Sequence, residues 1–136
     1  MTDTQKTQIN RGLRNIYLDK TKSSLIDGKN GILLYQGYNI HDLAKYSTFE
    51  ETAYLLIHGH LPNQKQLDTF DQDLKDKREL PPEILDIIKL LKNSHPMDVL
   101  RTAISAMSVP VNSQTNLEKF ALTHGTRVLA SVPSII

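Results

Sequence analysis

The chain has 136 residues, no cysteine, and 16 basic against 15 acidic residues, which gives a formal net charge of +1. This balance leaves no excess of positive charge that would attract nucleic acid or an anionic membrane. The lack of cysteine excludes disulfides and thiolate metal sites. No apolar stretch approaches the roughly twenty residues of a membrane span, so a soluble, cytoplasmic protein is expected. The polar residues 1–10 lack the apolar run of a signal peptide and are expected to form a disordered tail before one folded region, 11–136.

The first folded element is expected to be a β-hairpin. Two short apolar runs, 25–26 and 32–35, flank the turn residues of 27–31, which include Asp-Gly and Asn-Gly pairs. Gly37 then marks a second turn, and a short helix is expected over 39–44.

A longer helix is expected after Thr48, because Thr48 and Glu51 have the spacing of a capping box and apolar residues follow at helical intervals. It should stop near His58, since Gly59 suits a left-handed C-cap and Pro62 prevents continuation. Asn63 is expected to cap the next helix, which is amphipathic and is expected to lie on the surface, with the apolar positions Leu67, Phe70 and Leu74.

Two strongly apolar helices should follow as a helical hairpin. Pro82 opens the first, whose wide apolar face consists of Ile84, Ile87, Ile88 and Leu91, with Leu85 and Leu90 extending it toward full burial. Pro96 opens the second, for which Ser94 is the expected N-cap. Its apolar stripe contains Met97, Leu100, Ile104 and Met107, with Val99, Ala103 and Ala106 beside it. The small alanines allow a neighbouring helix to approach closely.

The remaining sequence predicts a polar loop over 111–115 and a last helix that Pro133 interrupts or ends. That helix is expected to contain Leu117, Phe120, Ala121, Val128 and Leu129. The chain closes on the apolar run 131–136, without a cap or a charge, so we expect the folded region to be truncated at its carboxyl end.

No catalytic, cofactor-binding or metal-ligating residue is predicted. His58 and His60 have no third ligand at suitable spacing, and His124 has no neighbouring acid. His95 is interpreted as a helix-end hydrogen-bonding group rather than a ligand-binding one. The sequence also lacks a phosphate-binding glycine loop and a nucleophile elbow.

The order of several motifs resembles the amino-terminal part of the citrate synthase family. These are Arg11-Gly12-Leu13, the segment from Leu25 to Leu43, Phe49 to Leu56, Gly59-His60-Leu61-Pro62 and His95-Pro96-Met97. The resemblance runs from about Arg11 to the end of the chain, and favours the shorter archaeal and Gram-positive type, which includes 2-methylcitrate synthases. Gln36 and His41 depart from the family pattern, in which an arginine and an acidic residue are usual.

The resemblance implies a mainly α-helical large domain with a short amino-terminal β-hairpin. It implies a homodimeric acyltransferase that condenses oxaloacetate with acetyl-CoA and water to citrate and CoA, at the entry to the tricarboxylic acid cycle, with no bound cofactor. The family's catalytic aspartate and histidines follow the matched segment, so no residue here inherits a catalytic role. The candidates for the dimer interface are Ile84, Ile87, Ile88, Leu91, His95, Met97, Leu100, Ala103, Ile104, Ala106 and Met107.

Three alternative functions are considered for a sequence of this kind. A 2-methylcitrate synthase, using propionyl-CoA, is not separable from a citrate synthase by these residues. A non-catalytic helical interaction subunit would pair with a separately encoded catalytic part. A helical DNA-binding domain is a poor fit, because the net charge is near neutral and Arg101 is the one basic side chain on the second apolar helix that could contact DNA bases.

Overall fold

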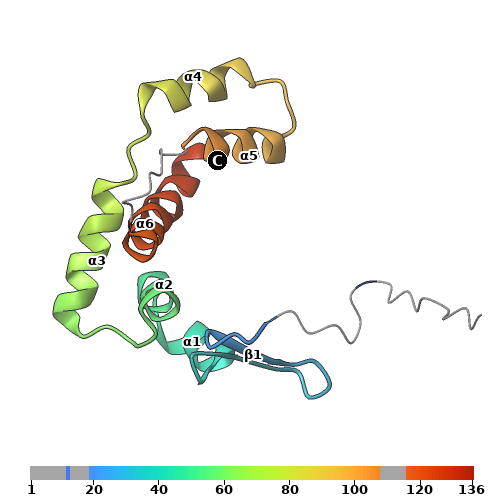
Figure 1. Ribbon diagram of the computed structural model, residues 1–136, viewed down its shortest axis with the longest axis vertical. Helices are drawn as coiled ribbons and strands as arrows, with labels where there is room; N and C mark the ends of the chain where they lie inside the picture. The colour runs from blue at the N-terminus through green and yellow to red at the C-terminus, as the bar shows by residue number, and fades with distance from the viewer. Residues whose placement is uncertain (1–11, 13–18, 108–115) are drawn as a thin grey trace, which may run out of the picture.

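Figure 1 shows the computed structural model of the protein, which describes Gly12 and residues 19–107 and 116–136. The strands are β1 (Ser24–Asp27), β2 (Ile32–Tyr35) and β3 (Tyr38–Asn39). The helices are α1 (Ile40–Tyr46), α2 (Phe49–His58), α3 (Gln64–Asp76), α4 (Pro82–Leu90), α5 (Pro96–Ala106) and α6 (Leu117–Ile135). The expected mainly α fold with a small β-hairpin is confirmed. The predicted tail, 1–10, and the predicted loop, 111–115, lie outside the described residues.

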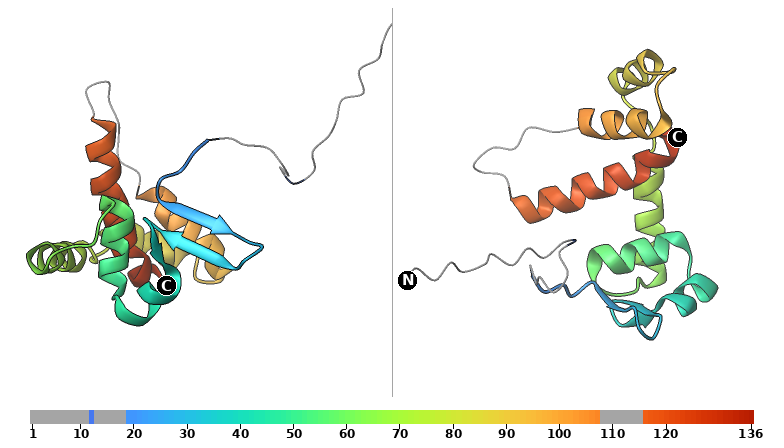
Figure 2. Two further views of the ribbon diagram at one scale, coloured as in Figure 1. Left: turned by 90° about the horizontal axis from the view of Figure 1, so that it is seen from below. Right: turned by 90° about the vertical axis from the view of Figure 1, so that its right-hand side faces the viewer.

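The helices form an open arrangement with two ends. The sheet, α1 and α2 lie at one end, α4 and α5 lie at the other, and α3 spans the distance between them (Figures 1 and 2). Helix α6 packs against both α3 and α5, while α2 packs on α3 and α4 on α5. As a result α6, the last element in sequence, joins the two ends of the molecule.

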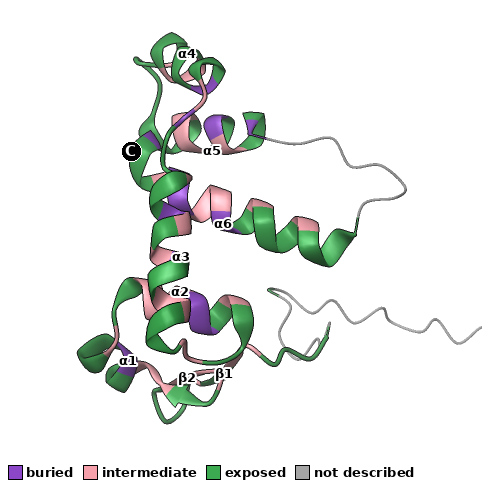
Figure 3. Cartoon of the chain, turned by 90° about the vertical axis from the view of Figure 1, so that its left-hand side faces the viewer, coloured by how far each residue is buried: buried purple, intermediate pink, exposed green. Residues whose placement is uncertain are grey.

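Two separate apolar clusters hold this arrangement. One contains Leu80, Ile84, Ala103, Met107 and Ile135, from α4, α5, the end of α6 and the segment before α4. The other contains Tyr54, Phe70, Leu74 and Ala130, from α2, α3 and α6. Buried positions are sparse elsewhere, and much of the surface of α4 and of the first half of α6 is exposed (Figure 3).

The hairpin is confirmed, and the sheet has one strand more than expected. Strands β1 and β2 pair antiparallel with Asp27 opposite Ile32, and β2 pairs with β3 with Tyr35 opposite Tyr38. The turn between β2 and β3 consists of Gln36 and Gly37, with φ angles of 48° and 88°. Two positive φ angles are typical of the tight hairpin turn that matches strand twist. Because β3 has two residues, it lacks the alternation by which a strand is recognised.

Replacing Gln36 with asparagine is expected to raise the free energy of unfolding by about 0.5–1 kcal/mol, because asparagine tolerates the left-handed conformation that glutamine adopts only under strain. The backbone hydrogen bond from Gln36 N–H to the Ser23 carbonyl, 2.9 Å, does not depend on the side chain. Urea denaturation measures the change, and Gly37→Ala should have the opposite sign. A loss of stability in Gln36→Asn would mean that the Gln36 side chain, which reaches Gly59, contributes more than its backbone strain costs.

Local capping chemistry determines both ends of α2 and the start of α3, as predicted. Thr48 and Glu51 form a reciprocal capping box at the start of α2, and Gly59 ends that helix with a φ of 80°. Asn63 caps α3, and its partner in a second capping box is Gln66, at 3.0 and 2.9 Å. One side of α3 is exposed as expected, and its opposite side is buried between α2 and α6.

The predicted N-cap of α5 is wrong. His95, not Ser94, occupies the capping position, and its Nδ1 accepts a hydrogen bond from the Met97 N–H at 3.2 Å. The reason is positional: Pro96 is the first helical residue, so the residue directly before it is the N-cap. The interpretation of His95 as a helix-end hydrogen-bonding group is confirmed.

Two further expectations about helix faces and ends are wrong. Leu85 and Leu90 do not approach full burial, since 41% and 83% of their surfaces are exposed, because no other element of the described chain covers that side of α4. Pro133 neither interrupts nor ends α6, which continues to Ile135. A single missing N–H removes one hydrogen bond, and the Ile136 N–H still donates to the Val132 carbonyl at 3.3 Å.

Candidate functional site

The interface candidates all lie in α4, in α5, in the short connection between them, or at Met107, the C-cap of α5. Three of them, Ile84, Ala103 and Met107, are buried within the chain, where they pack with Leu80 and Ile135. These three side chains form the internal core that fixes α4 against α5 and both against the end of α6. Their packing therefore determines how α4 and α5 lie against each other.

The other candidates lie on the outside of the same hairpin. Half-buried are Ile87, Ile88, Leu91, Leu100 and Ile104, and exposed are His95, Met97 and Ala106. Part of this set, Ile88, Met97 and Leu100, lines a groove of about 760 Å³ that the end of α6 closes. An apolar groove on a helical hairpin is suited to receive another helix.

Two ion pairs lie on the outside of the hairpin, and one of their members, Lys89, also lines the groove together with Lys92. Asp86 and Lys89 pair on α4 at 3.1 Å, and Asp98 and Arg101 pair on α5 at 3.0 Å. All four side chains are well exposed, so each pair contributes little to stability.

The Ser131 side chain on α6 forms a hydrogen bond with the end of α3. Its side chain is fully buried, and its hydroxyl lies 2.8 Å from the Arg127 carbonyl and 3.3 Å from the Lys77 carbonyl. Lys77 is the C-cap of α3, where carbonyl groups lack partners within the helix. The single hydroxyl proton is shared between the two carbonyls, which compensates for the desolvation of the buried hydroxyl and links α6 to the end of α3. Ser131 is not predicted from the sequence, because nothing local distinguishes it from an exposed serine.

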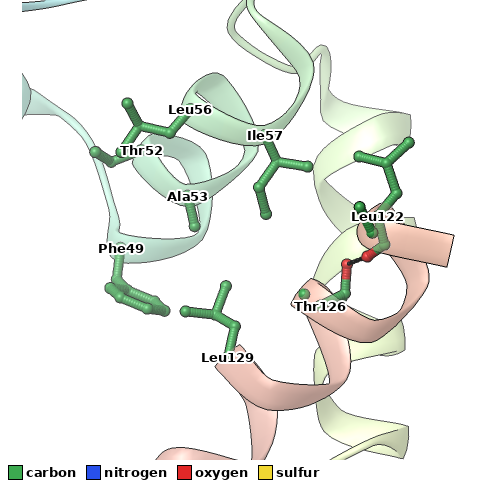
Figure 4. A pocket seen from close by; sticks show the side chains of 10 residues that line it. Phe49, Thr52, Ala53, Leu56, Ile57, Leu122, Thr126 and Leu129 are labelled. Carbon is green, nitrogen blue, oxygen red and sulfur yellow. Dashed lines mark hydrogen bonds between the residues drawn. The ribbon is translucent and has the colours of Figure 1, made fainter. Parts of the chain in front are cut away.

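A second apolar pocket lies between α2 and α6. It has a volume of about 500 Å³, and side chains of Phe49 and Ala53 face those of Leu122 and Leu129 across it (Figure 4). Thr126 also lines it, and its hydroxyl is satisfied by the Leu122 carbonyl at 2.8 Å, so the walls are almost entirely apolar. This pocket is not predicted from the sequence either, because its two walls lie far apart along the chain.

Aromatic rings fill the corner between α2 and α3. The ring of Tyr54 lies 4.1 Å from that of His58 and meets Phe70 edge to face at 5.4 Å. Partial burial holds the pKa of His58 below its usual value, and the nearby positive charge of His60 lowers that pKa further. The His58 ring therefore packs against the rings of Tyr54 and Phe70 at the edge of the α2–α3–α6 cluster, while the residue itself stays exposed.

The other histidines do not assemble a reactive centre in the part of the chain that the structure describes. His60 Nδ1 lies 3.1 Å from the His58 carbonyl, His124 stacks on Phe120 with ring centroids 4.1 Å apart, and His41 is exposed on α1. Within residues 19–107 and 116–136, no three histidine, aspartate or glutamate side chains are grouped to hold a metal ion. None of the described helices is long and apolar enough to cross a membrane.

Comparison with known proteins decides the family. Residues 12–136 match the family model described as the C-terminal domain of citrate synthase. The chain belongs to the citrate synthase family. The expectation drawn from the motif order is therefore confirmed.

Similarity to citrate synthases extends over nearly the whole chain. The chain is 38% identical to the citrate synthase of Haloferax volcanii, with 95% of this chain and 36% of that protein covered. Its structure matches that of the citrate synthase from Pyrobaculum aerophilum with a TM-score of 0.84 and 33% identity, covering 93% of this chain and 34% of that one. It is also 35% identical to the 2-methylcitrate synthase of Shewanella oneidensis, covering 100% of this chain and 36% of that protein. The chain spans about a third of the length of these citrate synthase relatives.

Proposed function

We propose that this chain is the amino-terminal part of the large domain of a citrate synthase, a cytoplasmic homodimer that condenses oxaloacetate with acetyl-CoA and water to citrate and CoA. The observation that carries the proposal is the structural match to the Pyrobaculum aerophilum citrate synthase, at a TM-score of 0.84 over 93% of the chain. The order of motifs in the sequence supports the same function. Similarity of this kind in both sequence and structure exceeds what a shared fold alone implies.

In this proposal the chain supplies scaffold and subunit interface, while residues outside it supply the chemistry. The outer face of the α4–α5 hairpin is the proposed contact with the second subunit, since Met97, Leu100 and Ile104 leave apolar surface uncovered. An isologous contact would pair this face with its own copy across a twofold axis. The buried set, Ile84, Ala103 and Met107, would then support the interface without touching the partner.

The 136-residue chain by itself is expected to show no condensation above the uncatalysed rate. The physical reason is that the proposed catalytic base and the groups that polarise the ketone lie outside it, so nothing here stabilises the developing charges. The measurement is release of free thiol from acetyl-CoA in the presence of oxaloacetate. The protein from the complete reading frame is the positive control. Turnover by the short chain would refute the proposed division of roles.

A second candidate, 2-methylcitrate synthase, is favoured by the identity of 35% with the Shewanella oneidensis protein across the whole chain. The two functions differ in one methylene of the acyl group, and a difference of this size is worth about 1–3 kcal/mol in an apolar pocket. Comparing kcat/KM for acetyl-CoA and propionyl-CoA with the complete protein separates them. A preference for propionyl-CoA would replace the first proposal with the second.

A further inference from the structure

The tip of the β1–β2 hairpin contains an unusual chemical grouping. Asn30 and Gly31 form the single Asn-Gly pair in the sequence, and both residues are exposed. Gly31 has a φ of 65°, and apart from its two chain neighbours no other residue comes within 4 Å of the place where a β-carbon would stand. A glycine following asparagine places no side chain in the way of its own main-chain nitrogen. The nitrogen is therefore sterically open to react with the preceding side chain.

We propose that Asn30-Gly31 is a site of spontaneous covalent modification, whose rate the neighbouring Asp27 side chain restrains. The Gly31 main-chain nitrogen attacks Cγ of Asn30, forming a C–N bond and a five-membered succinimide. The bond from Cγ to Nδ2 breaks, and ammonia leaves with the proton that the Gly31 nitrogen loses. Water then opens the ring at either carbonyl, which produces aspartate or isoaspartate at position 30.

The restraint comes from three hydrogen bonds to one carboxylate. Asp27 Oδ1 accepts the main-chain N–H groups of Lys29 and Asn30, at 3.1 and 3.2 Å, and Asp27 Oδ2 accepts from Asn30 Nδ2 at 2.7 Å. Nδ2 is the atom that must leave as ammonia. The shortest of these bonds, from Asn30 Nδ2 to Asp27 Oδ2, therefore fixes the amide group at which the reaction takes place. Effective attack requires the nucleophile and the carbon to be aligned, and a side chain held toward Asp27 is less free to reach that alignment.

The charge of Asp27 acts in the same direction. Hydrogen bonds from Asn30 hold the pKa of Asp27 below its usual value, so the carboxylate is ionised at neutral pH. Attack requires the Gly31 nitrogen to lose its proton, and a nearby negative charge opposes that loss. The same residue that shapes the turn therefore slows its modification.

Modification would turn the attractive contact between Asn30 and Asp27 into a repulsive one. The product replaces the Nδ2 donor with a carboxylate oxygen opposite Asp27 Oδ2, so attraction becomes repulsion between like charges. Isoaspartate also adds a methylene to the main chain within the turn, which conflicts with the pairing of Asp27 and Ile32. The expected consequence is an opened hairpin tip, with the helices unaffected.

The test follows each asparagine by peptide mapping while the 136-residue chain is incubated at mildly alkaline pH. Asn30 is expected to convert first, with the mass gain of an amide becoming an acid and with isoaspartate detected enzymatically. Asn93, which is exposed and followed by serine, is the internal control and should stay intact longer. Asn30→Gln should abolish modification at this position, because its longer side chain cannot close a five-membered ring.

Two variants and one condition isolate the restraint. Asp27→Ala should speed the conversion of Asn30 several-fold, and Asp27→Ser, which keeps one acceptor oxygen but removes the charge, should give an intermediate rate. The chain unfolded in guanidinium chloride should convert faster than the folded chain at the same pH. The proposal is overturned if Asn30 outlasts Asn93, or if Asp27→Ala leaves the rate unchanged.

Discussion

Replacing Phe70 with alanine is expected to lower the free energy of unfolding by about 3–5 kcal/mol, the range for deleting a buried aromatic ring. Phe70 lies in the cluster through which α3 meets both α2 and α6, with Leu74 and Ala130. Its ring also meets Tyr54 edge to face at 5.4 Å, an interaction that adds to the burial of area. Loss of the ring would leave a cavity at the point where three helices join.

Urea denaturation followed by circular dichroism measures this loss, with Leu90→Ala as the control. Leu90 is 83% exposed on α4, so its replacement should change stability by no more than about 0.5 kcal/mol. Since total stability is small, Phe70→Ala could prevent folding, and Phe70→Leu provides a milder variant with an expected loss of about 1 kcal/mol. Equal effects of Phe70→Ala and Leu90→Ala would show that the α2–α3–α6 cluster is not a core.

Replacing Ala103 with leucine is expected to destabilise the chain by about 1–3 kcal/mol through overpacking. Ala103 has no exposed surface and packs in the cluster with Ile84 and Ile135, so a larger side chain must displace a neighbouring helix. Helix propensity is nearly the same for alanine and leucine, so packing alone should determine the result. The measurement is the free energy of unfolding of the 136-residue chain.

Ala106→Leu is the matched variant on the same helix. Ala106 is exposed within this chain, so the substitution should leave the unfolding free energy nearly unchanged. In the complete protein it should weaken the proposed dimer, which dilution in the analytical ultracentrifuge measures. Unchanged dissociation would remove Ala106 from the interface, and an unchanged stability in Ala103→Leu would contradict the packing of α4, α5 and α6.

Sequence alone predicted those features that depend on neighbouring residues. The start of α2 at Thr48, its end at Gly59 and the cap of α3 at Asn63 were all predicted, because each uses hydrogen bonds between residues a few positions apart. The β1–β2 hairpin was predicted for the same reason. The predicted N-cap of α5, Ser94, was one residue too early. Pro96 is the first helical residue, so the residue before it, His95, is the N-cap.

For the candidate interface, sequence determined the apolar stripe of α5 and tertiary structure decided how it is used. Periodicity places Ala103 and Ala106 alike, yet Ala103 is completely buried and Ala106 is exposed, because α4 and the end of α6 cover one side of the stripe. The bond from Ser131 to the Lys77 carbonyl and the pocket between α2 and α6 were likewise not predicted. Each joins residues far apart in sequence, and the free energy of such contacts depends on how whole helices pack rather than on the pattern within any one of them.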